Sequence, residues 1–196
     1  MVEETVKSWQ KQRQPEYPYL YSLWGFRYCD LLLRKEKGTA HEVRERAEKA
    51  LEIAKRNRQL LSIGLDTLTL GRAGMMQAME DGTDETDFTR AAAHLDRAVA
   101  GLREAGTYDH LPRGLLARAE CYRRQKQFSK ARDDLNEALE IAKSGIMKLY
   151  LVDYHLEAGR LCQTEGKTVE AKDHFTTAAK MIEETGYHRR DKEVGQ

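Results

Sequence analysis

The sequence contains few residues that would interrupt a helix or cross-link the chain. Its 196 residues include 3 prolines and 3 cysteines, and no proline follows Pro112. Because proline breaks the interior of a helix, long helices can form over most of the chain. Cys29, Cys121 and Cys162 lie far apart without a C-x-x-C pair, which excludes a disulfide framework and a zinc site built on cysteines. We therefore expect three reduced core thiols in a cytoplasmic protein.

A long apolar run and an excess of one charge are also missing. No stretch approaches the ~18 apolar residues of a membrane span, and the N-terminus lacks the apolar core of a secretory signal. The 33 Lys and Arg residues nearly balance the 32 Asp and Glu residues, which leaves a net charge of +1. A chain without an overall positive field does not hold nucleic acid by electrostatics alone. We therefore expect neither a membrane nor a nucleic acid as the partner.

Helical periodicity is present throughout the chain. Apolar residues recur at spacings of three and four, as in Leu135, Ala138, Leu139 and Ala142, and no long alternating stretch predicts a strand. We expect an all-α fold with more than about 70% helix. Eight helices are predicted, preceded by a shorter one at 3–13. Their ranges are 16–36, 40–57, 60–81, 87–105, 111–126, 129–143, 147–164 and 168–185.

Two long stretches of the sequence align at a constant offset of 40 residues. The first contains Ala119, Tyr122, Phe128, Ala131, Leu135 and Ala138, and the second contains Gly159, Cys162, Thr168, Ala171, Phe175 and Ala178. Small residues on two paired helices let the helices approach closely, and stacked pairs share one core. Looser copies lie upstream. We expect one domain over 1–196, a right-handed solenoid of antiparallel helix pairs with a capping helix (1–15), four repeats (16–58, 59–106, 107–145, 146–186) and a tail (187–196).

These residues resemble the tetratricopeptide repeat. Its pattern of a small residue, an aromatic three positions later, and then glycine, aromatic and alanine is matched in the third repeat, except that Lys126 stands where glycine is usual. The fourth repeat departs at Cys162 and Thr168. Segments such as QPEYPYLYSLWGFRYCDLLL, TLGRAGMMQAM and EETGYHRRD also look like the C-terminal repeat region of bacterial NACHT- or AAA-type signalling NTPases. That likeness implies a fragment or a stand-alone relative of such a protein.

The repeat resemblance implies a concave groove, lined by first helices, that binds a peptide or protein segment. Guanidinium groups suit carboxylates, and methionine surfaces accept varied apolar side chains. We therefore expect an acidic or C-terminal partner segment, bound chiefly by four arginines; the alternative for Arg123 is an exposed residue paired with a neighbouring glutamate. Exposed solenoid ends would allow oligomers. The resemblance directs into the groove Phe26, Arg72, Met75, Met76, Arg113, Leu116, Glu120, Arg123, Leu156 and Arg160.

No residue pattern predicts catalysis, a cofactor or a metal. The six histidines include no i, i+4 pair, and no serine lies in a nucleophile elbow. Gly166-Lys167-Thr168 imitates the end of a phosphate-binding loop, but Leu161 replaces the required glycine and no strand precedes it. We expect a non-catalytic interaction scaffold. A small-molecule or nucleotide sensor that uses the same groove remains the alternative, and it would need a closed pocket.

Overall fold

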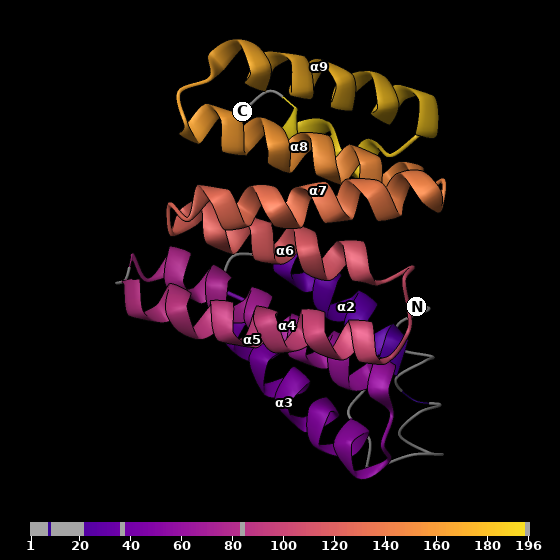
Figure 1. Cartoon of the computed structure of the whole chain (residues 1–196). Helices are drawn as coiled ribbons and strands as arrows, with labels where there is room; N and C mark the ends of the chain where they lie inside the picture. Colours follow the sequence, from indigo (N-terminus) through magenta and orange to yellow (C-terminus); the bar gives the residue numbers. More distant parts are fainter. Residues whose placement is uncertain (1–7, 9–21, 36–37, 83–84, 195–196) are drawn as a thin grey trace. The chain divides into compact units, whose positions relative to one another are not determined.

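The chain folds into helices joined by short turns. The structure is a computed structural model that describes residues 8, 22–35, 38–82 and 85–194 (Figure 1). Helices make up 85% of it and no strand occurs among the described residues, which confirms the expected all-α class. Apart from residue 8, the predicted helix at 3–13 falls outside those ranges. None of the described helices is long and apolar enough to cross a membrane.

The chain divides into two compact units, residues 1–107 (unit 1) and 108–196 (unit 2). In unit 1, α4 (Leu60–Glu80) packs along α5 (Glu85–Glu104), and α2 (Ser22–Lys35) and α3 (Ala40–Arg56) both pack against α4. A small core of unit 1 contains Cys29, Leu33, Val43 and Ala73.

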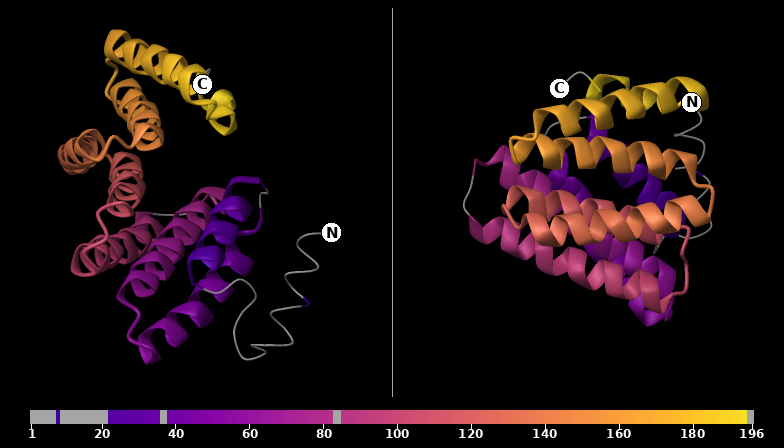
Figure 2. Two further views of the ribbon diagram at one scale, coloured as in Figure 1. Left: turned by 90° about the vertical axis from the view of Figure 1, so that its right-hand side faces the viewer. Right: turned by 45° about the horizontal axis from the view of Figure 1, so that its top comes forward.

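Unit 2 consists of two helix pairs and a short tail. The first pair is α6 (Leu111–Arg124) with α7 (Phe128–Ser144), and the second is α8 (Lys148–Thr164) with α9 (Thr168–Thr185). Helix α8 also packs against both α6 and α7, so the two first helices of the pairs are neighbours (Figure 2). The tail forms a 3-10 helix, η1 (His188–Glu193), that contacts α9.

Close helix contacts form where the alignment places small residues. A Cβ atom added to Gly159 would lie 2.8 Å from Cε1 of Phe175, and one added to Gly71 would lie 2.7 Å from Cδ2 of Leu95. Real Cβ contacts are longer, so only glycine permits these approaches. The aligned alanines of the third repeat are buried as predicted: Ala119, Ala131 and Ala138.

One turn geometry recurs from α5 to the tail. A residue with positive φ occurs every 20 residues at Gly106, Lys126, Ile146, Gly166 and Gly186, with φ of 66°, 58°, 52°, 78° and 67°. After α6, the N–H groups of residues 125, 126 and 127 donate to the carbonyls of residues 121, 123 and 122. The same three bonds follow α7 and α8, shifted by 20 and 40 residues. The shared geometry supports the predicted 40-residue register.

Candidate functional site

The apolar residues that the repeat pattern directs into a groove take part in helix packing. Phe26, Met75, Leu116 and Leu156 are buried, and Leu156 belongs to the core of unit 2. Met76 is half-buried and packs against the small core of unit 1. Four of the five apolar candidates therefore belong to the packed interior and not to an exposed groove.

The four candidate arginines are distributed over both units, and each contacts a neighbouring helix. In unit 1, Nη1 of Arg72 on α4 donates to Oδ1 of the buried Asp30 on α2 at 2.6 Å. In unit 2, Nε of Arg113 on α6 lies 3.4 Å from the hydroxyl of Tyr150 on α8, and its guanidinium lies 5.7 Å from the ring centroid. These contacts join consecutive first helices.

Arg123 makes a contact as short as that of Arg72, also with a buried carboxylate. Its Nε donates to Oε1 of Glu157 on α8 at 2.6 Å, and the two side chains are only 11% and 6% exposed. Arg160 donates from Nη1 to the second oxygen of Glu157 at 3.4 Å and from Nη2 to Glu193 at 2.7 Å. We call the set Arg123, Glu157, Arg160 and Glu193 the arginine–carboxylate ladder.

Burial and the nearby arginines act in opposite directions on the pKa values of Glu157, which belongs to this ladder, and of its neighbour Glu120. Burial, followed by the nearby Glu120, raises the pKa of Glu157, against the lowering effect of Arg123. Burial would also raise the pKa of Glu120, but Arg124, at 2.8 Å, lowers it overall. The guanidiniums of Arg123 and Arg124 therefore stabilise the ionised forms of two carboxyl groups whose burial disfavours ionisation.

The tail of the chain binds to α8 through the same kind of contact. Nε of Arg190 in η1 donates to Oδ1 of Asp153 at 2.8 Å, while Glu193 accepts from Arg160. Tyr187, just before η1, packs into the core of unit 2 with Val152. A short segment that is not an α-helix is thus held on a first helix by one acidic and one basic side chain.

Comparison with known proteins relates one helix pair of unit 2 to a protein family. Residues 112–144, which cover α6 after its first residue and all of α7, match the family model for the tetratricopeptide repeat. This helix pair is therefore similar to a tetratricopeptide repeat. Such repeats generally mediate protein–protein interaction and are typically non-catalytic. No significant match to a curated protein or to a solved structure was found.

The second helix pair of unit 2, which follows the matched tetratricopeptide repeat, holds a histidine pair that the sequence reading missed. Nδ1 of His155 on α8 lies 3.0 Å from Nδ1 of His174 on α9, and Tyr154 makes edge contacts with both rings. Burial and then His174 lower the pKa of His155 to about 4, and burial lowers the pKa of His174. Among the described residues no group of three His, Cys, Asp or Glu could hold a metal ion. The two positions lie at similar distances from the turn at Gly166, which is the signal that could have paired them.

Unit 1 contains a buried carboxyl that the sequence reading also passed over. Asp66 on α4 is 4% exposed, and its Oδ2 has no hydrogen-bond partner among the described residues. Burial raises the pKa of Asp66 to about 8. The side chain is therefore protonated in the folded protein at neutral pH.

Proposed function

We propose that the protein is a non-catalytic interaction module that binds a peptide or protein segment on the first-helix face of unit 2. This face is the surface of α6 and α8 that carries Arg113, Glu120, Arg123 and Arg160. The partner segment carries an acidic side chain or a free C-terminus, because paired guanidiniums bind planar carboxylates in a fixed geometry. Arg72 and Met76 mark the corresponding first-helix face of unit 1.

The contact of η1 with α8 is the observation that most directly supports this proposal. Glu193 reaches the guanidinium of Arg160 from outside the helix pairs, at 2.7 Å. Arg160 keeps 27% of its side chain exposed, whereas Arg123 keeps 11%. Arg160 is therefore the arginine best placed to exchange an internal carboxylate for one from a partner.

The resemblance of several segments to the repeat region of bacterial signalling NTPases supports a setting for this function. We propose that the module acts in the cytoplasm as the interaction region of a larger signalling protein of that kind, or beside one. Binding of the partner segment would then connect the module to a signalling process, and any catalytic activity would lie outside the module.

The test is selection of ligands from displayed peptide libraries, one with free C-termini and one with internal segments. Selected peptides should be enriched in acidic residues or depend on the free carboxylate. Arg160→Gln should weaken their binding about tenfold, because one charge-assisted bond is lost. Glu193→Gln should strengthen binding, because it removes the internal competitor.

Arg132→Gln is the matched control. Arg132 on α7 also pairs with a carboxylate, that of Glu165 at 2.5 Å, but lies on a second helix. Its removal should leave peptide affinity within about twofold of the wild type. Equal losses in the Arg160 and Arg132 variants, or peptides without acidic groups, would place the binding surface elsewhere.

A further inference from the structure

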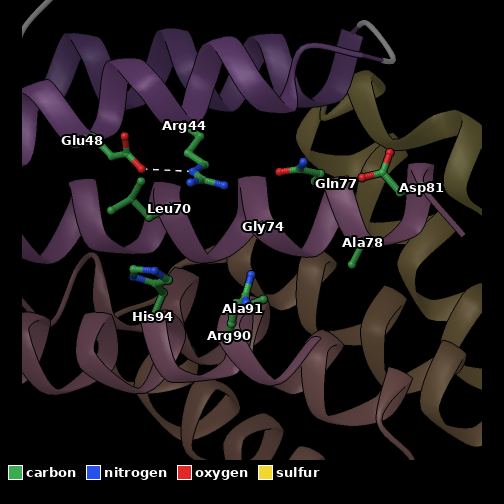
Figure 3. A pocket seen from close by; sticks show the side chains of 10 residues that line it. All are labelled: Arg44, Glu48, Leu70, Gly74, Gln77, Ala78, Asp81, Arg90, Ala91 and His94. Carbon is green, nitrogen blue, oxygen red and sulfur yellow. Dashed lines mark hydrogen bonds and ion pairs between the residues drawn. The ribbon is translucent and has the colours of Figure 1, made fainter. Parts of the chain in front are cut away.

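Unit 1 contains a pocket of about 220 Å³ between α3, α4 and α5. Figure 3 shows α4 crossing the pocket as its floor, with Arg44 reaching in from α3 and with Arg90 and His94 reaching in from α5. Gln77, on the last turn of α4, and Asp81, which follows the end of α4, lie toward one end. All residues that line the pocket belong to unit 1, so the pocket shares none with the first-helix face of unit 2 and its ligand is independent of the proposed function.

The hollow exists because two small residues face each other. At Gly64 and Gly71 of α4, the opposing residue on α5 is a leucine, which fills the space next to the glycine. At Gly74 the opposing residue is Ala91, and an added Cβ would meet its Cβ at 3.7 Å, an ordinary contact. Packing does not require glycine at residue 74. Because Gly74 has no side chain, a space remains there that no neighbouring side chain fills.

Hydrogen-bond donors line the middle of the pocket. Nε of Arg44 donates to Glu48 at 3.0 Å, which leaves its two Nη groups for other acceptors. Nδ1 of His94 lies 3.1 Å from Nη2 of Arg97. Because a guanidinium only donates, Nδ1 is the acceptor, and the ring carries its proton on Nε2. Burial and then Arg97 and Arg44 lower the pKa of His94, which keeps this neutral donor form.

Acceptors lie at the end of the pocket where α4 terminates. Asp81 directly follows the last helical residue, Glu80, and the C-terminal carbonyls of a helix attract positive charge. The floor between the two ends is apolar and small, formed by Gly74 and Ala78 together with Ala91. Residues 74 and 81 are about 10 Å apart along a helix.

We propose that this pocket binds a small extended zwitterion of the ω-amino-acid or dipeptide type. Its carboxylate lies between Arg44 and Arg90, its methylene groups lie on the floor at Gly74 and Ala78, and its ammonium group lies at Asp81. The lining contains two arginines and two acidic residues, Glu48 and Asp81, so a ligand with both charges fits it better than a plain anion. The pocket is smaller than sites for drug-sized molecules, which limits the ligand to this size.

Three probes of equal length separate the contributions: ε-aminocaproate carries both charges, caproate only the carboxylate, and hexylamine only the ammonium group. For a dissociation constant of about 1 mM, about 10 mM ε-aminocaproate should raise the unfolding midpoint of unit 1 by roughly 5 °C. Caproate and hexylamine should each give a smaller rise. Titration calorimetry on the full chain would confirm one site.

Gly74→Leu is the decisive variant. It fills the pocket, and leucine is a better helix former than glycine, so the fold should persist while the ligand effect is lost. Ala93→Leu adds the same bulk at an exposed position of α5 and should keep the effect. Arg44→Gln should lose the effect, whereas Arg56→Gln, which removes the same charge from the exposed end of α3, should keep it.

Asp81→Asn tests the orientation. It should reduce the advantage of ε-aminocaproate over caproate, because only the ammonium group loses its partner. The proposal is wrong if none of the three probes raises the midpoint, if Gly74→Leu responds like the wild type, or if caproate matches ε-aminocaproate in the wild type.

Discussion

Single residues determine how the recurring turn is built. Ile146 has a φ of 52° in a position whose counterparts, 40 residues away on either side, are Gly106 and Gly186. A β-branched side chain is strained in this left-handed region, and that of Ile146 is 77% exposed, so it gains little from burial. The glycine next to it, Gly145, has a φ of −87° and does not relieve the strain.

We expect Ile146→Gly to raise the free energy of unfolding by about 1 kcal/mol, because glycine adopts this conformation without a Cβ clash. Urea unfolding of unit 2, followed by circular dichroism, would measure the change. Ile146→Ala removes the same exposed side chain but keeps the Cβ atom, so it should have a much smaller effect. An equal gain in both variants would mean that the turn is not strained at this residue.

At the scale of helices, much of the fold could be predicted from the sequence. Helix periodicity and the 40-residue alignment indicate the helices of residues 40–185 within a few residues and the small residues at their contacts, because these features recur. The start of the first predicted helix, at 16–21, lies outside the described residues. The partners of the arginines do not recur. Glu157 lies 34 residues after Arg123 on the next first helix, and no pattern within one repeat indicates that spacing. The histidines of the His155–His174 pair do not recur at the aligned positions of the preceding repeat, so the repeat alignment does not indicate them.

The contact between Arg123 and Glu157 determines how an Arg123 variant should behave. Removing this arginine leaves a buried carboxylate with one weaker partner, at 3.4 Å from Arg160. We therefore expect Arg123→Ala to lower the free energy of unfolding by about 3 kcal/mol. Denaturant titration would measure this loss.

Two further variants isolate the cause. Arg124→Ala removes the partly exposed neighbour that pairs with Glu120 and should cost less than about 1 kcal/mol. Adding Glu157→Gln to Arg123→Ala should recover part of the loss, because the buried charge is gone. If the double variant is no more stable than Arg123→Ala, the buried charge is not what destabilises it.

At the scale of the whole molecule, the two units should respond differently to acid. The pKa of Asp66 rises from an ordinary value of 3.8 to about 8 on folding, so its contribution to stability is complete below pH 4 and is lost as the pH rises toward 8. The pKa of His155 falls from 6.5 to about 4, so its contribution is complete above pH 6.5 and is lost as the pH falls toward 4. The lowered pKa of His174 acts in the same direction as that of His155, and the raised pKa of Glu157 partly offsets both in unit 2. The lowered pKa of His94 partly offsets Asp66 in unit 1.

We expect acidification from about pH 7 to 5 to destabilise unit 2 relative to unit 1. Hydrogen exchange, corrected for its intrinsic pH dependence and resolved along the chain, would show protection falling first in α8 and α9. In Asp66→Asn the gain of unit 1 on acidification should disappear, while unit 2 behaves as in the wild type. Uniform loss of protection across both units would contradict this assignment.

The close contact between Gly159 and Phe175 constrains how the repeats of this chain can recombine during evolution. The aligned positions in the preceding repeat hold Ala119 and Leu135, so each repeat pairs a particular small residue with a particular large one. A crossover that joined the first helix of one repeat to the second helix of the next would set an alanine against the phenylalanine, at 2.8 Å from its ring. We therefore expect whole 40-residue blocks to be exchanged without this clash, and positions 159 and 175 to change together within a lineage.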